Sequence, residues 1–419
     1  MSSNMPTASD PESAQPSAEP RIAVSSIGLQ RQLGDLQRKL KGGELGSIPV
    51  VVGLIVIAAV FQTANGQFLS AQNLSNLAMQ VASTGVMAIG LVLVLLLGEI
   101  DLSVGSVSGL TAAAMVILNV QHGWPTGISI AAAVAFGAAI GLVHGLIFAK
   151  AGVPAFVLTL AGLIGWQGLQ LFILGSHGTI NVPYNGGIAS LANTFYPPAV
   201  GYALGAVIVA VYLLSAIKQR RRRRKAGLRT QPLLHLLVRA ALLLVLLVAV
   251  TAVLGKWRGV PLPLLIFGGL VVITDLVLRR TRFGRRIFAV GGNIEAARRA
   301  GINIAQVRIS VFVLCSAFAA VGGVLAASRL FAVNQQSGSG DVLLNAIAAA
   351  VIGGTSLFGG RGSTYSALLG ILVIGAVSNG MDLLNQASSV KFMITGAVLL
   401  AAVVIDSLSR RTRNASGRA

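Results

Sequence analysis

The sequence has little cysteine, little histidine and few charged residues, and each scarcity excludes a class of site. Its one cysteine, Cys315, lies inside an apolar run, which excludes an intrachain disulfide and a cysteine metal centre. The four histidines are scattered without the spacing of metal ligands. No Gly-x-x-x-x-Gly-Lys-Ser/Thr segment occurs, so this chain should not hydrolyse ATP. We therefore expect no catalytic residue, no metal site and no cofactor in this chain.

Apolar residues dominate the composition instead. Hydrophobic residues make up 54% of the chain and charged residues only 11%, with a mean hydropathy of +0.80. A chain of 419 residues with this composition cannot fold in water without exposing a large apolar surface. The sequence therefore predicts an all-α polytopic membrane protein.

About twelve apolar segments are candidates for membrane-spanning helices, each of which needs roughly 20 apolar residues. They cover residues 48–64, 75–97, 103–119, 127–148, 153–174, 199–217, 237–255, 262–278, 308–328, 342–358, 364–384 and 391–407. Three of them are less regular, because 103–119 and 342–358 are short and 262–278 begins among prolines. We expect a transmembrane domain at 47–408, with tails at 1–46 and 409–419. The first tail is rich in serine and proline, which predicts disorder with a short surface helix.

The basic residues predict how the chain is oriented. If both termini are cytoplasmic, 28 of the 32 lysines and arginines fall in cytoplasmic segments, as the positive-inside rule requires. The net charge of +20 therefore indicates membrane orientation and not a nucleic-acid partner. The loop 279–307 lies on the cytoplasmic side, and the loop 175–198, which has no lysine or arginine, on the other. The unbroken basic run Arg220–Lys225 could contact anionic lipid or a partner, but a topology signal is the favoured interpretation.

The segment Gly98–Ser106 breaks a long apolar region with two carboxylates, two hydroxyl groups and two glycines. One hypothesis makes Glu99 and Asp101 an ion-coupling pair of a secondary transporter. A second places the segment on a substrate path. A third, which we favour, makes Asp101 and Ser103 caps of the next helix at the cytoplasmic side.

A partial echo of this segment occurs later in the chain. Gly98, Asp101, Leu102 and Gly105 align without gaps on Gly353, Ser356, Leu357 and Gly360. Paired broken helices of this kind commonly flank a transport site. One interpretation is therefore an internal repeat.

A short helix is predicted within the cytoplasmic loop. Asn293 can cap a helix that begins at Ile294, Glu295 suits its positive end, and Gly301 can stop it. Such a helix could rest on lipid headgroups, or it could dock into a groove on a cytosolic partner.

Several motifs together resemble a known family. Glu295-Ala296-Ala297, followed by three residues and Gly301, is similar to the coupling-loop motif of ABC importer permeases. The segments 98–106, 153–160 and 346–357 resemble the branch that serves ribose, xylose and related sugars. The segment 199–255 resembles a helical hairpin that the D-xylose permeases add to a ten-helix core.

The resemblance implies a permease subunit in a bacterial inner membrane that carries a monosaccharide, D-xylose in particular. It also implies a second permease copy, a cytosolic ABC ATPase that binds the ATP, and an extracytoplasmic sugar-binding protein. Membrane lipid is the remaining partner. The ATPase-coupling residues would be Phe283, Gly284, Arg285, Arg286, Glu295, Ala296, Ala297 and Gly301.

A neutral sugar needs hydrogen-bonding groups along its path through the membrane. The candidates for this path are Glu99, Asp101, Ser103, Ser106, Gln167, Gln170, Asn345, Thr355, Ser356 and Asn379. Bonds between helices are the ordinary alternative role for such side chains.

Overall fold

The computed structural model describes residues 48–228, 230 and 232–415. The tail predicted at 1–46 lies outside the described residues, and so do the last four residues of the chain. The described part of the predicted C-terminal tail belongs to a helix that continues to Ala415.

The fold is helical, and the predicted class of all-α polytopic membrane protein is confirmed. In the described residues, nine helices are long and apolar enough to cross a membrane. Together with the three shorter apolar helices, they account for all twelve predicted segments. The nine are α3 (Ala71–Leu96), α4 (Val104–Val116, extended by η1, Ile117–Gln121), α5 (Thr126–Leu146, extended by η2, Ile147–Ala151), α6 (Ala155–Leu174), α8 (Pro198–Lys225), α9 (Leu233–Gly255), α10 (Leu262–Arg280), α13 (Ile304–Leu330) and α15 (Thr364–Leu383).

The three shorter apolar helices are α2 (Ile48–Ala64), α14 (Asp341–Ile352) and α16 (Ser388–Ala415). The span predicted at 342–358 is wrong in extent, because α14 has only 12 residues. At 1.5 Å per residue it is about 18 Å long, well short of a hydrocarbon core of about 30 Å. The chain after α14 is an irregular glycine-rich segment that ends where α15 begins at Thr364.

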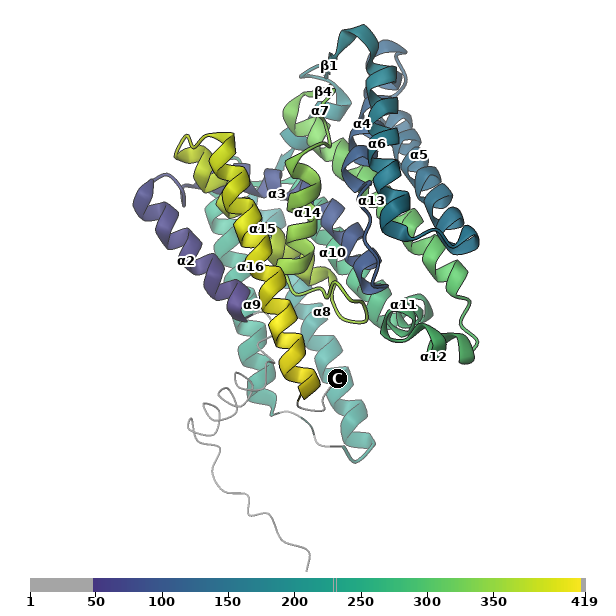
Figure 1. Cartoon of the computed structure of the whole chain (residues 1–419). Coiled ribbons are helices and arrows are strands. Elements are labelled where there is room, and N and C mark those ends of the chain that lie inside the picture. Colours follow the sequence, from purple (N-terminus) through teal and green to yellow (C-terminus); the bar gives the residue numbers. More distant parts are fainter. Residues whose placement is uncertain (1–47, 229, 231, 416–419) are drawn as a thin grey trace, which may run out of the picture. The chain divides into compact units, whose positions relative to one another are not determined.

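Helix α3 forms the centre of the bundle (Figure 1). Every residue from Val86 to Leu96 is buried, so this half of α3 has protein on all sides. It packs against α13, α15, α10 and α14, while α13 also packs along α5 and α4. A helix that is apolar around its whole circumference is stable in such a position, which explains the long apolar run in the sequence.

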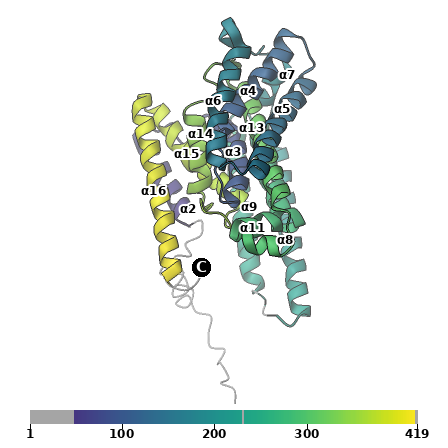
Figure 2. The ribbon, with the colours of Figure 1, turned by 45° about the vertical axis from the view of Figure 1, so that its right-hand side comes forward.

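The two ends of the bundle differ in structure. Two short helices, α11 (Arg282–Gly292) and α12 (Ile294–Arg299), lie at the lower right in Figure 1, below α5 and α13, and Figure 2 again shows α11 below α13. The upper end in Figure 1 carries α7 (Gly187–Asn193) and the antiparallel pair β1 (Thr179–Asn181) and β4 (Ala332–Asn334). A second short pair joins β2 (Phe195–Tyr196) to β3 (Val260–Pro261). These pairs, with the turn η3 (Gly175–His177), tie the loop 175–198 to the ends of α13 and α10.

The segment predicted as an inserted hairpin, 199–255, coincides with α8 and α9. These helices pack against each other, and much of their remaining surface is apolar and exposed. Leu214 on α8 is 68% exposed and Leu242 on α9 is 65% exposed. Surfaces of this kind are stable only against lipid or another protein.

Glycines allow α14 and α15 to pack closely. A methyl group at Gly370 would overlap the carbonyl oxygen of Ala349, and one at Gly353 would overlap that of Ser366. Membrane helices lack a strong hydrophobic drive to associate, so such close approach is a main source of their stability.

The close approach predicts the effect of Gly370→Ala. We expect the free energy of unfolding to fall by about 1–3 kcal/mol, because the two helices must separate to admit the methyl group. The matched control is Gly268→Ala in α10, where nothing lies within 4 Å of the added atom. Thermal unfolding of both purified variants tests this, and equal stability of the two would contradict the packing argument.

Candidate functional site

Three separate segments of the backbone meet at one point near the lower end of the bundle. The Gly360 N–H donates a hydrogen bond to the carbonyl oxygen of Leu96 at 2.9 Å. Gly291, in the last turn of α11, lies so close to the same oxygen that a methyl group there would overlap it. A methyl group on Gly359 would come within 2.8 Å of the Gly291 carbonyl oxygen and 2.9 Å of the Gly98 nitrogen. We call Gly98, Gly291, Gly359 and Gly360 the glycine junction.

Glycine is required at this junction for two reasons. The φ angles of Gly98, Gly359 and Gly360 are +81°, +84° and +72°, in the left-handed region that other residues rarely adopt. The backbones also approach too closely for side chains. The two segments that echo each other in sequence are therefore in direct contact here.

Asp101 is completely buried just beyond the junction. Its Oδ1 accepts hydrogen bonds from the Ser103 backbone N–H at 2.9 Å and from the Ser103 hydroxyl at 2.6 Å. Its Oδ2 is buried without a hydrogen-bond partner in the part of the chain that the structure describes, although the Cys315 thiol interacts with this carboxylate. The Ser103 hydroxyl lies 3.4 Å from Nδ1 of His144, whose Nε2 is 3.0 Å from the Trp166 indole nitrogen.

This geometry refines the capping hypothesis. Ser103 is the N-cap residue of α4, but its side chain makes no capping hydrogen bond to the helix. Asp101 instead holds the turn that precedes the helix, by bonding Ser103. The side chain of Asp101 is completely buried, so its bonds to Ser103 also offset part of the cost of removing the carboxylate from water.

Glu99 has a cationic partner. Its carboxylate lies 3.7 Å from the Arg308 guanidinium, and the two side chains are only 24% and 23% exposed. Burial raises the pKa of the Glu99 carboxyl, and the charge of Arg308 opposes part of this rise. Both carboxylates of the break therefore interact with protein groups, and no group of three metal-ligating side chains occurs in the described residues.

The predicted short helix in the cytoplasmic loop is confirmed as α12. Oδ1 of Asn293 accepts the Ala296 N–H at 2.9 Å, and Gly301 follows the helix with a φ of +77°. Glu295 and Arg298 form an exposed ion pair at 3.0 Å. Ala297 is buried, so α12 rests on the bundle by one face and presents charged side chains on the other.

Helix α11 is a second element of this region, and it is not among the predicted elements. Its N-cap Thr281 accepts the Gly284 N–H, while Ile287 and Val290 are buried. Thr281 and this apolar spacing are the signals that predict such a helix. The predicted coupling residues Phe283, Gly284, Arg285 and Arg286 all lie on α11, and both arginines are exposed.

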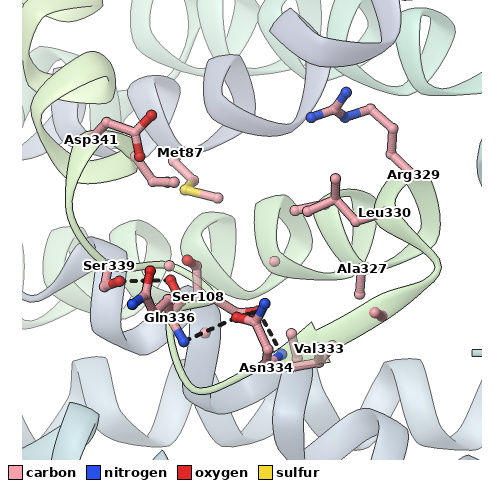
Figure 3. A pocket seen from close by; sticks show the side chains of 18 residues that line it. Met87, Ser108, Ala327, Arg329, Leu330, Val333, Asn334, Gln336, Ser339 and Asp341 are labelled. Carbon is pink, nitrogen blue, oxygen red and sulfur yellow. Dashed lines mark hydrogen bonds between the residues drawn. The ribbon is translucent and has the colours of Figure 1, made fainter. Parts of the chain in front are cut away.

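A polar cavity of about 310 Å³ lies beside β4 and the end of α13 (Figure 3). It is enclosed by α3, α4, the end of α13 and the chain that joins β4 to α14. Its side chains with hydrogen-bonding groups are Ser108, Arg329, Asn334, Gln336, Ser337, Ser339 and Asp341. Figure 3 shows Arg329 and Asp341 on opposite sides of the cavity.

Gln170 holds the chain that lines one side of this cavity. The side chain is fully buried and donates to the carbonyl oxygens of Asn334 at 2.9 Å and Ser337 at 3.1 Å. Gln170 is among the predicted path residues, whereas the cavity is not part of the prediction. The available signal was the uncharged polar stretch from Asn334 to Gly340 between two apolar segments.

The other predicted path residues do not form one cluster. Asn379 exchanges two hydrogen bonds with Asn73 at 2.7 and 3.0 Å, which joins α15 to α3. Ser106 donates to the Ser103 carbonyl oxygen, and the Ser356 hydroxyl accepts the Phe358 N–H. Gln167 is half-buried on α6, one turn before Gln170.

A few predicted residues retain unused hydrogen-bonding capacity. Oε1 of Gln170, Oδ1 of Asn345 and Oγ1 of Thr355 are buried without a hydrogen-bond partner among the described residues. Such atoms are uncommon in folded proteins and call for a reason.

Comparison with known proteins gives a family match and three close relatives. Residues 73–403 match a family described as branched-chain amino acid transport system / permease component. The xylose transport system permease protein of Escherichia coli K12 is 35% identical over 373 residues, covering 89% of this chain and 94% of the relative. The xylose transport system permease protein of Haemophilus influenzae is 35% identical over 374 residues, covering 89% of this chain and 99% of the relative. The ribose import permease protein of E. coli K12 is 32% identical over 358 residues, covering 85% of this chain and 92% of the relative. No solved structure matches.

The bonds of Asp101 predict which substitutions the site tolerates. Asp101→Asn keeps an oxygen that can accept both Ser103 bonds, so we expect nearly unchanged stability and transport. Asp101→Leu leaves a buried N–H without its partner and should cost about 1–3 kcal/mol of stability. Thermal unfolding and uptake assays of both variants test this, and loss of transport by a well-folded Asp101→Asn would instead favour a role for the charge.

Proposed function

We propose that this chain forms the membrane path for a monosaccharide, D-xylose in particular. The chain belongs to the family of ABC transporter permease components that includes the xylose and ribose permeases. It is a multi-pass protein of the inner membrane and not an enzyme. The choice of D-xylose is supported by the two xylose permeases, which resemble the chain over nearly their whole length. The similar ribose permease supports the wider class of pentoses.

The observation that carries this proposal is the contact of α11 with the glycine junction. Helices α11 and α12 present exposed charged residues that a cytosolic ATPase can bind. Through Gly291, α11 touches the carbonyl oxygen of Leu96, and that oxygen also holds Gly360. A displacement of α11 by an ATPase therefore shifts the ends of both broken segments at once, which is the kind of rigid movement that alternating access requires.

The polar cavity is the proposed entry site for the sugar. A volume of about 310 Å³ is at the lower end of the range for small-molecule pockets, which begins at about 300 Å³. Its hydroxyl and amide groups match the donors and acceptors of a neutral sugar. Farther along, the unused oxygens of Gln170, Asn345 and Thr355 are the best-supported path contacts among the predicted residues.

The basic residues support a cytoplasmic location for both termini. α11, α12 and the described end of α16 lie at the lower end in Figure 1. The β1–β4 pair lies at the other end. Strand β1 belongs to the loop 175–198, which lacks lysine and arginine, and strand β4 lines the cavity. An extracytoplasmic binding protein would deliver sugar to this upper end, and a second copy of the chain would complete the path.

Reconstitution of the chain with its ATPase and binding protein tests the function. We expect D-xylose uptake that requires ATP and the binding protein. Uptake that an ion gradient drives without ATP would contradict the proposal and would favour coupling through Glu99 or Asp101.

Charge reversal in α12 tests the docking role. Glu295→Lys should lower uptake at least tenfold and weaken ATPase association, because it reverses a charge on the docking face. The control is Glu295→Lys with Arg298→Glu, which restores the ion pair within α12 but exchanges the two charges. Rescue by the double variant would show that Glu295 only stabilises the helix, and no rescue is the result that docking predicts.

A further inference from the structure

A second cavity, of about 560 Å³, lies between α8, α9, α10 and the first turn of α15. It is strongly basic. Its lining includes five arginines, Arg220, Arg223, Arg239, Arg279 and Arg280, and one carboxylate, Asp275. The sugar path described above uses none of these residues.

The positive charge in this cavity is largely uncompensated. Asp275 pairs with Arg279, with Nε of Arg279 2.7 Å from Oδ1 of the carboxylate. Nε of Arg220 is shielded from solvent and has no hydrogen-bond partner in the described residues. Guanidinium groups that line one cavity repel one another, and a bound anion relieves this repulsion. Their planar donors suit the oxygens of a phosphate, which they can bind in pairs.

The basic run Arg220–Lys225 is divided by this cavity into two sets. Arg220 and Arg223 line it, one helical turn apart, together with Ala216 and Gln219 on the same face of α8. Arg221, Arg222, Arg224 and Lys225 lie outside it. A signal for membrane orientation depends on the number of charges and not on the helix face that carries them. The cavity therefore gives two of these arginines a second role.

The surroundings of the cavity indicate a lipid. It lies where the apolar part of α8 changes to the basic part. Towards the membrane, Val211 and Leu214 on α8 and Val245 on α9 are 60%, 68% and 64% exposed. Tyr212 and Tyr365 line the cavity at this level, as aromatic residues often do at a membrane surface. A ligand with a phosphate in the cavity could lay acyl chains along the exposed apolar faces.

We propose that this cavity binds the phosphate headgroup of an anionic glycerophospholipid from the cytoplasmic leaflet. Basic pockets between membrane helices on the cytoplasmic side are suited to such headgroups. The bound lipid would fix the α8–α9 pair against α10 and α15, since arginines from α8, α9 and α10 would share one anion.

Native mass spectrometry of the delipidated full-length protein, titrated with phosphatidylglycerol or phosphatidylcholine, tests the proposal. The test pair of substitutions is Arg220→Gln with Arg223→Gln, and the matched control is Arg221→Gln with Arg224→Gln. Both remove two charges from the same helix, so they perturb membrane orientation equally. Arg239→Gln on α9 provides a third variant that leaves α8 intact.

We expect the wild-type protein to prefer phosphatidylglycerol. The test pair should weaken its binding roughly 30-fold, the factor that corresponds to about 1 kcal/mol for each basic residue near an anionic surface. Arg239→Gln should weaken it about fivefold, and the control pair should change it less than twofold.

Three results would overturn the proposal. Equal losses in the test and control pairs would show that only total charge matters. Equal binding of phosphatidylcholine would remove the role of the anionic headgroup. Displacement of phosphatidylglycerol by millimolar inorganic phosphate would identify a site for soluble anions instead of lipid.

Discussion

The structure depends on one backbone contact, in which the Leu96 carbonyl oxygen accepts the Gly360 N–H beside Gly291. A helix that ends within a membrane protein leaves backbone groups unpaired, and these must find partners inside the protein. Here the end of α3 finds one in the segment that follows α14. The last turn of α11 lies against the same oxygen, so the irregular parts of the bundle and helix α11 share the same few atoms.

The polar side chains within the bundle divide into two groups by their bonding. Asp101, Ser106 and Asn379 bond to neighbouring protein groups and hold helices or turns in place. Oδ1 of Asn345, Oγ1 of Thr355 and, in the 310 Å³ cavity, Nε of Arg329 have no hydrogen-bond partner among the described residues and retain capacity for a ligand. A transporter of a neutral sugar needs side chains of both groups. The bonded side chains keep the path rigid, and the unbonded ones bind the sugar weakly enough to release it.

Much of the fold could be predicted from the sequence, because each membrane helix is a local apolar run. Helix α12 could be predicted as well, since Asn293 and Gly301 mark its two ends. The polar cavity could be predicted only in part, from the polar stretch Asn334–Gly340, because its other walls include Met87 and Ser108, which lie far from that stretch in the chain. The two faces of the basic run likewise become distinct only when α9 and α10 form a cavity together with α8. Apolar periodicity indicates which residues are buried, but it does not indicate which polar groups from distant parts of the chain lie close together.

The central claim is that movement of the docking helices reaches the broken membrane segments through Gly291. Two adjacent glycines allow a direct measurement, because a methyl group at Gly291 would overlap the Leu96 carbonyl oxygen, whereas nothing lies within 4 Å of one at Gly292. The measurement is sugar uptake per ATP hydrolysed by the reconstituted transporter. The claim predicts that Gly291→Ala lowers this ratio at least tenfold while the ATPase still associates, and that Gly292→Ala leaves it unchanged. Equal ratios for a folded Gly291→Ala and Gly292→Ala would contradict it.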